Sequence, residues 1–186
     1  AIPVASPAAL SPAAKESIPE IEAYARFIRL GRFQVPYEGR DLDIADFYAA
    51  DEDLFKVFSF DFLSGDPATA LRDPGSIVLT ERTARSIFGT EQALGKILEF
   101  GQGPAQRAVK VTGVIRDVPR NSHFAFNLLI STATLRPQPA AAGQNAPPQR
   151  NMLEENYTFG VHAYVLLAKP SDRPEVERKI QAVVEE

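Results

Sequence analysis

Histidine is the residue type best suited to acid–base chemistry near neutral pH, and this chain has two, His123 and His162. Neither has an acid or a nucleophile locally paired with it that would favour a general base. A zinc site would need carboxylate ligands as well, and no spacing indicates which carboxylates these would be. We therefore expect both histidines to be structural residues that form hydrogen bonds.

Acidic residues crowd one stretch and could supply oxygen ligands to a hard cation. The members of this group are Asp41, Asp43, Asp46, Asp51, Glu52 and Asp53. The glycine and the terminal glutamate of an EF-hand loop are missing there, which weakens the case for calcium. Residues 51–53 directly precede an apolar segment, and negative charge favours the N-terminus of a helix. We expect these three acids to begin a helix over residues 54–58, and we expect no metal site.

Other catalytic and cofactor motifs are absent from the sequence. It contains neither a G-x-S-x-G nucleophile elbow nor a Walker A pattern. Gly101 and Gly103 match only part of G-x-G-x-x-G, because Gln106 takes the third position, so we expect a hairpin loop there. There is no cysteine, which excludes disulfides and thiolate metal sites. We predict no catalytic, cofactor-binding or metal-binding residue, and nothing in the sequence indicates a substrate or partner interface.

Composition narrows the class of protein further. The 186 residues are 45% apolar, which is enough for a packed core. The net charge of −4, from 20 basic and 24 acidic residues, argues against a nucleic-acid partner. No apolar run approaches the ~20 residues that span a bilayer. The chain begins at Ala1 and ends within a helical pattern, so we expect a piece of a longer protein whose flanks hold the membrane anchors.

Residues 76–98 form the clearest local unit of the sequence. An apolar strand over residues 77–79 is followed by Thr80, whose side-chain oxygen can cap a helix. Gly89 can end that helix by adopting a positive φ, and a second strand is expected at residues 97–100. The residues that share the apolar face of the helix are Thr83, Ala84, Ile87 and Phe88.

Periodicity and turn residues predict the remaining elements. The dipeptide Glu38-Gly39 predicts a hairpin within residues 34–46. The segment 157–167 is apolar on both faces toward its end, so we expect a central strand. Residues 136–150, rich in proline, alanine and glutamine, are expected to form a mobile loop. Helices are also expected over residues 12–17 and 171–186, and strands over residues 21–30, 108–114 and 126–130.

Two patterns predict which side chains are buried. In the strand at 21–30, apolar residues alternate with Glu22, Tyr24 and Arg26, which places these three on a solvated face. An aromatic cluster follows, and phenylalanine side chains are usually core. The members of the cluster are Phe55, Phe58, Phe60 and Phe62.

Segments taken in order along the chain resemble the MacB-like periplasmic core domain, the extracytoplasmic part of MacB/FtsX-type ABC transporter permeases. The similarity covers nearly the whole chain, and residues 136–156 match least. The segments are PEIEAYARF from Pro19, DLFKVFSFDFLSGDP from Asp53, SIVLTERTARSIFG from Ser76, ALGKIL from Ala93, VTGVIRDVPRNSHFAF from Val111 and YVLLAKP from Tyr164.

The resemblance implies an α+β fold with two lobes. Residues 1–71 and 155–186 would form a porter-like α/β lobe, and residues 72–154 a smaller, β-rich α/β lobe inserted into it. Residues 76–98 would open the inserted lobe. The domain would be periplasmic, non-catalytic and without a cofactor, and it would belong to an inner-membrane protein.

The resemblance also implies a function and partners. A separate cytoplasmic ABC ATPase would hydrolyse ATP, and the domain would couple this hydrolysis to a periplasmic conformational change, a role called mechanotransmission, for export or extraction of a substrate. Its partners would be its own flanking transmembrane helices, the ATPase, and a second copy or a paired permease. A periplasmic or outer-membrane protein is a further candidate.

Two other classes of function stay open on the sequence alone. The phenylalanine-rich segment and the loop at 136–150 would also suit an extracytoplasmic module that senses a ligand or binds a peptide or lipid. An enzyme is the third hypothesis, supported only by the two histidines and the scattered acids.

Overall fold

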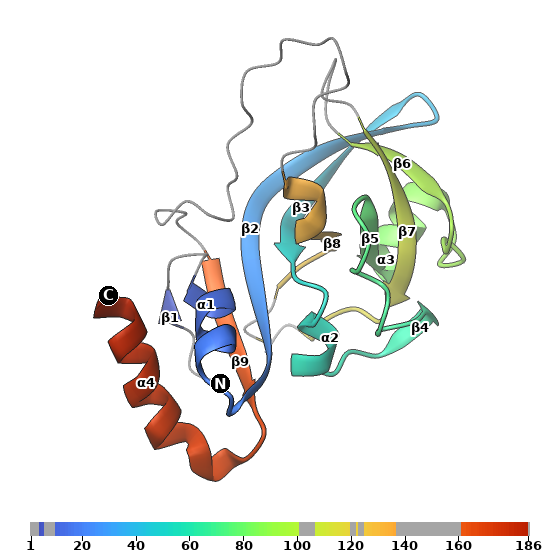
Figure 1. Ribbon diagram of the computed structural model, residues 1–186. Helices are drawn as coiled ribbons and strands as arrows, with labels where there is room; N and C mark the ends of the chain where they lie inside the picture. The colour runs from blue at the N-terminus through green and yellow to red at the C-terminus, as the bar shows by residue number, and fades with distance from the viewer. Residues whose placement is uncertain are drawn as a thin grey trace, which may run out of the picture.

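The computed structural model of the chain describes residues 4–5, 10–100, 107–119, 122, 125–136 and 161–185. Runs of strands are separated by short helices along these ranges (Figure 1). In chain order they are β1 (Val4–Ala5), α1 (Leu10–Ser17), β2 (Ile21–Tyr37), β3 (Arg40–Ala50), α2 (Leu54–Val57), β4 (Phe62–Gly65), β5 (Ser76–Thr80), α3 (Glu81–Phe88), β6 (Ile97–Phe100), β7 (Arg107–Ile115), β8 (Leu128–Ser131), the 3-10 helix η2 (Thr132–Leu135), β9 (Val161–Leu167), the 3-10 helix η3 (Pro170–Asp172) and α4 (Arg173–Glu185).

One mixed sheet of nine strands holds the described residues together, in the order β1-β9-β2-β3-β8-β5-β7-β4 with β6 also beside β7. The pairs β3–β8 and β5–β7 are parallel, and the other pairs are antiparallel. A mixed sheet combined with helices confirms the predicted α+β class.

The prediction that the strand near residues 157–167 is central is wrong. This strand, β9, lies between β2 and the two-residue β1, one place from the end of the sheet. Its apolar residues cover two faces: Tyr164 packs in the cluster around α2, while Val165 and Leu167 pack against α1 and α4. A strand is apolar on both sides when other elements cover both of its faces. This pattern does not indicate where the strand lies in the order of the sheet.

Strand β2 runs for 17 residues and is the longest element of the fold. It joins the predicted strand at 21–30 and the first arm of the predicted hairpin into one strand, with register shifts on either side of Gly31. The predicted turn at Glu38-Gly39 is confirmed, and both of its residues have positive φ, 48° and 75°. The register shifts on either side of Gly31 allow the β2–β3 hairpin to bend there while its two strands stay paired.

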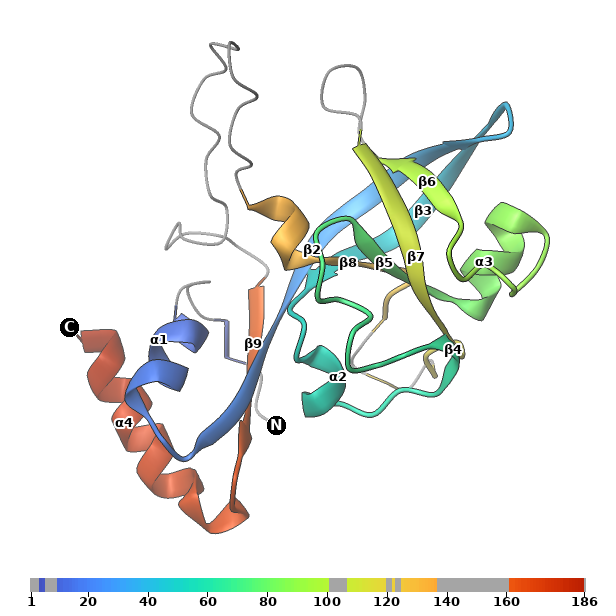
Figure 2. The same ribbon diagram turned by 45° about the vertical axis from the view of Figure 1, so that its right-hand side comes forward.

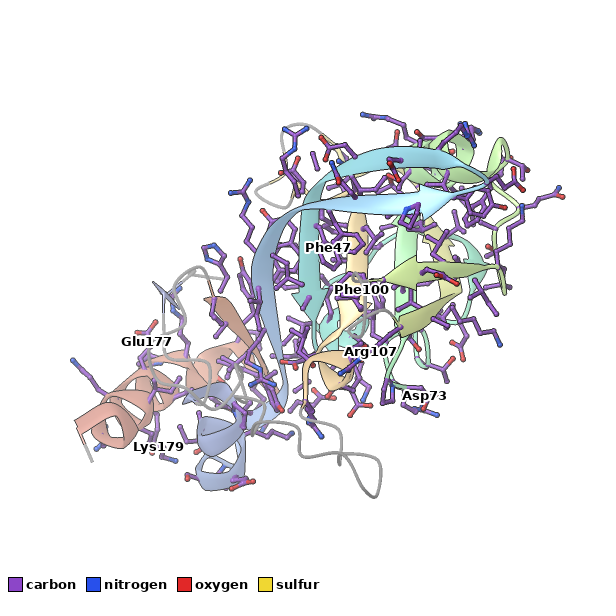
Figure 3. All side chains as sticks on the ribbon, turned by 90° about the horizontal axis from the view of Figure 1, so that it is seen from above. Phe47, Asp73, Phe100, Arg107, Glu177 and Lys179 are labelled. Carbon is purple, nitrogen blue, oxygen red and sulfur yellow. The ribbon has the colours of Figure 1, made fainter. Side chains whose placement is uncertain are left out.

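Two groups of elements lie on either side of the β2–β3 hairpin (Figures 1 and 2). Helices α1 and α4 lie side by side next to β9 and the first half of β2, around a small apolar cluster. The strands β4 to β8 and α3 lie beyond β3. There the outer half of the hairpin folds over β6, so that the rings of Phe33 and Phe100 stack with their centroids 4.2 Å apart. Figure 3 shows Phe47 and Phe100 facing each other in this part of the core.

The local unit at 76–98 forms as predicted. Thr80 Oγ1 accepts a hydrogen bond from the backbone N–H of Thr83 at 3.3 Å and so caps α3. Gly89 ends the helix with a φ of 71°. Thr83, Ala84 and Ile87 are buried, as the spacing indicated, and β6 pairs with β7. The loop expected at residues 101–104 lies outside the described residues.

Two glycines with positive φ provide a test of close backbone packing. A Cβ at Gly89 would meet open space, whereas a Cβ at Gly65 would overlap the backbone oxygen of Thr112 on β7. We expect Gly89→Ala to lower the free energy of unfolding by about 1 kcal/mol, the cost of a left-handed conformation. Gly65→Ala should lower it by at least about twice as much, because overpacking adds to the same conformational cost. Urea unfolding measures both changes, and equal losses would contradict the close approach of β4 to β7.

Candidate functional site

The residues singled out for acid–base chemistry do not form a site in the described part of the chain. His162 lies exposed on β9 beside β1 and β2, where its register partners are Ala5 and Phe27. His123 lies outside the described residues. No group of three histidine, cysteine or acidic side chains that could hold a metal occurs among the described residues.

Four of the six acids at 41–53 form ion pairs, namely Asp43, Asp46, Asp51 and Asp53. Lys56 Nζ lies 2.6 Å from Asp53, and Arg32 Nη2 lies 2.5 Å from Asp43. The hydrogen bond from Arg32 lowers the pKa of Asp43. The predicted helix after these acids is α2, which ends one residue earlier than expected; Asp53 occupies its N-cap position without a side-chain hydrogen bond.

The aromatic cluster packs against the core, but its four phenylalanines are only partly buried, so the prediction of core side chains is confirmed in part. Phe55 packs edge-on against Phe60 and Phe62, with ring centroids 5.7 and 4.8 Å apart. Phe58 meets Tyr164 of β9 in the same way at 4.9 Å. These rings join α2 to the sheet.

Three buried polar side chains form a hydrogen-bonded group that we call the buried joint. It consists of Arg26 of β2, Asp51 directly after β3, and Thr132 at the start of η2. Arg26 donates from Nε to Asp51 Oδ2 and from Nη2 to Asp51 Oδ1, both at 2.8 Å. The backbone N–H of Arg26 donates to Oδ2 at 2.8 Å, and Thr132 Oγ1 donates to Oδ1 at 2.7 Å. The two charged residues are only 4% and 6% exposed.

Strand register brings the three residues of the buried joint together. Ala50 pairs with Phe27 on one side and with Ser131 on the other, so the residues next in sequence meet at the end of β3. The assignment of Arg26 to a solvated face is therefore wrong. Burial lowers the pKa of Arg26, but the hydrogen bonds and charge of Asp51 outweigh this effect and raise it overall. The guanidinium stays charged, and it also lies 5.8 Å from the ring centre of Tyr24.

Two further Arg–Asp pairs continue outward along the same hairpin. Arg29 lies 3.5 Å from Asp46, and Arg32 pairs with Asp43 nearer the turn. Arg29 and Arg32 stand three residues apart in β2, and the register shifts on either side of Gly31 lie between them. Exposure of the arginine side chain rises along the series from 4% to 59% and 69%.

An open hollow of about 220 Å³ lies where α3 begins. Asp46, Thr80, Asn127 and an exposed ion pair between Arg82 and Asp117 line it, with Nη2 of Arg82 2.7 Å from the carboxylate. All its charged groups are thus engaged with each other or with Arg29. Residues 120, 121, 123 and 124 lie outside the described residues.

A comparison with known protein families shows which family the chain belongs to. A family model described as the MacB-like periplasmic core domain matches residues 3–183. The chain belongs to this family. It is a periplasmic domain of a MacB/FtsX-type ABC transporter permease, and the ordered segments that carried the resemblance indicated the family correctly. No curated protein matches the chain.

Solved structures share the MacB-like fold at low sequence identity. A domain of a putative permease protein from Porphyromonas gingivalis is 24% identical with a TM-score of 0.70, covering 96% of this chain and 70% of that one. The periplasmic region of MacB from Actinobacillus actinomycetemcomitans is 15% identical with a TM-score of 0.64, covering 99% and 74%. The extracellular domain of the ABC-type transporter YknZ from Gram-positive bacteria is 14% identical with a TM-score of 0.58, covering 94% and 78%.

None of the helices described for this chain is long and apolar enough to cross a membrane.

The buried joint can be tested against the exposed pair on the same hairpin. Arg26→Met should lower the free energy of unfolding by about 3 kcal/mol, because it leaves Asp51 buried without its countercharge. Arg32→Met removes the exposed partner of Asp43 and should cost less than about 1 kcal/mol. Urea unfolding of the two variants measures the difference. Similar losses in both would show that the joint is no more important than a surface ion pair.

Proposed function

We propose that this MacB-like domain is a non-catalytic mechanical link, which couples ATP hydrolysis in the cytoplasm to a conformational change in the periplasm. The observation that carries the proposal is the connection from α1 and α4, at the two ends of the described chain, into one continuous sheet. Movement applied to these helices would reach β9 and β2 directly. The 17-residue β2 would then carry it to the strands beyond β3.

The buried joint supports this role because it holds β2 to the end of β3 and to the start of η2. Arg26 lies in the half of β2 that pairs with β9, whereas Asp51 directly follows β3 and Thr132 begins η2 directly after β8. A bidentate pair with low exposure resists shear between β2 and β3 better than exposed side chains do. The sheet would therefore move as a stiff body.

The proposal includes the partners of the domain in the whole protein. They are its own flanking transmembrane helices, a cytoplasmic ABC ATPase subunit, a second copy or paired permease, and a periplasmic or outer-membrane protein. We place the domain on the periplasmic side of the inner membrane. We also propose two lobes, residues 1–71 with 155–186 and residues 72–154, connected by β2 and β3. The periplasmic conformational change would serve to export or extract a substrate.

Mechanical coupling predicts that a flexible link between α4 and the sheet lowers transport without stopping ATP hydrolysis. A Gly-Gly-Ser insertion between Ala168 and Lys169, both exposed, would lengthen the link from β9 to α4. A flexible insertion in a surface turn changes stability little but transmits force poorly. We expect transport by the full-length permease to fall severalfold, while ATP hydrolysis by its ATPase continues.

The same insertion between Glu91 and Gln92 is the matched control, because this exposed turn joins α3 to β6 and does not connect the terminal helices to the sheet. Transport should survive it. Normal transport with the insertion after Ala168 would refute the mechanical link, provided that the protein is present in the membrane at the native level.

A further inference from the structure

Helix α4 is held to the rest of the chain by few contacts. Val176 is its one buried residue among those whose side chains are described, and Ile180 packs beside it in the small cluster formed with Ala14, Ile18 and Ile21. An isolated helix of this length is marginal in water, so its stability depends on docking. The few polar contacts that α4 makes with other elements therefore carry unusual weight.

Glu20 is where these polar contacts converge. It lies in the turn between α1 and β2, and its Oε1 accepts from Lys179 Nζ of α4 at 2.5 Å. Its backbone oxygen accepts from the N–H of Ala168 at 3.1 Å, just after β9. Lys179 also lies 3.3 Å from Glu175, one turn earlier in α4. One residue thus connects α4 both to the start of β2 and to the end of β9.

We infer that Glu20 and Lys179 form a clasp that decides whether α4 stays docked on the sheet. The inference deepens the proposed function, and it rests on that function only for its effect on transport. With the clasp closed, α4 moves with β2 and β9. With the clasp open, the small apolar cluster is all that holds α4 among the described residues, and movement of the helix no longer reaches the sheet.

The two members of the clasp are not equivalent. The second carboxylate oxygen of Glu20, Oε2, is shielded from solvent and has no hydrogen-bond partner among the described residues. Loss of Lys179 therefore leaves a carboxylate with one dry oxygen and no countercharge, which is a costly state. Loss of the charge on Glu20 leaves Lys179 beside Glu175 and partly in water, which is much cheaper. The hydrogen bond from Lys179 also lowers the pKa of Glu20, as expected for a closed clasp.

A matched control lies on the other side of the same helix. Glu177 pairs with Arg173 at 2.7 Å, and both belong to α4, so this pair does not connect the helix to anything else. Figure 3 shows Glu177 and Lys179 leaving opposite sides of α4. A charge removed at Glu177 changes the helix itself and leaves its docking untouched.

Amide hydrogen exchange of the 186-residue chain tests the clasp directly. In Lys179→Met we expect α4 amides to exchange at least about fivefold faster, because undocking exposes a marginal helix. Glu20→Gln should raise their exchange by a smaller factor. Glu177→Gln should change it less than about twofold, as for an exposed helix pair. Amides of β5 and β7 must stay protected in all three variants, which shows that the sheet remains folded.

Unchanged α4 exchange in Lys179→Met would overturn the clasp, and so would an equal increase in all three variants. Both outcomes are read without any transport assay, so they are separate from failure of the proposed function. If the clasp holds by this test but the full-length Lys179→Met permease transports normally, the clasp stands and the mechanical route through α4 fails.

Discussion

The buried ion pair between Arg26 and Asp51 is the interaction on which the arrangement of the chain depends. Removing two charges from water is costly, and a buried pair is tolerated only when its geometry is good and its other hydrogen-bonding groups are satisfied. Asp51 meets this condition, since two bonds from the Arg26 side chain, the Arg26 backbone N–H and Thr132 all donate to it. Three separate segments must be in register before the pair can form, so it selects one arrangement of β2, β3 and η2.

The other ion pairs of the hairpin have a different role from the buried joint. The pairs of Arg29 and Arg32 lie in solvent, where each contributes little to stability. They join β2 to β3 on either side of the bend at Gly31, where the two strands could otherwise slip past each other. A slip by one residue would move each apolar side chain of the outer hairpin from the core to water. Charge and apolar pattern thus favour the same register.

Stiffness in the middle of the domain contrasts with weak attachment at one end. The strands beyond β3 share large apolar clusters, whereas α1 and α4 share a cluster of four buried residues and one clasp. This distribution supports the proposed mechanical link.

The sequence by itself determined the features that depend on neighbours within a few residues. The cap at Thr80, the helix stop at Gly89, the turn at Glu38-Gly39 and the packing of the aromatic cluster against the core follow from local conformational preference and from apolar content, and the ordered segments were enough to indicate the family. The ends of elements and the place of β9 in the sheet did not follow, because strand order is set by pairing between distant segments.

Only the tertiary structure decided which charges are buried or joined. Arg26 alternates with apolar residues as a solvated side chain would, and its partners stand 25 residues away at Asp51 and, beyond that, at Thr132. Lys179 and Glu20 are separated by 159 residues. No local pattern indicates either contact, because the free energy of a charged group depends on the solvent and the countercharge around it, and both are supplied by the fold.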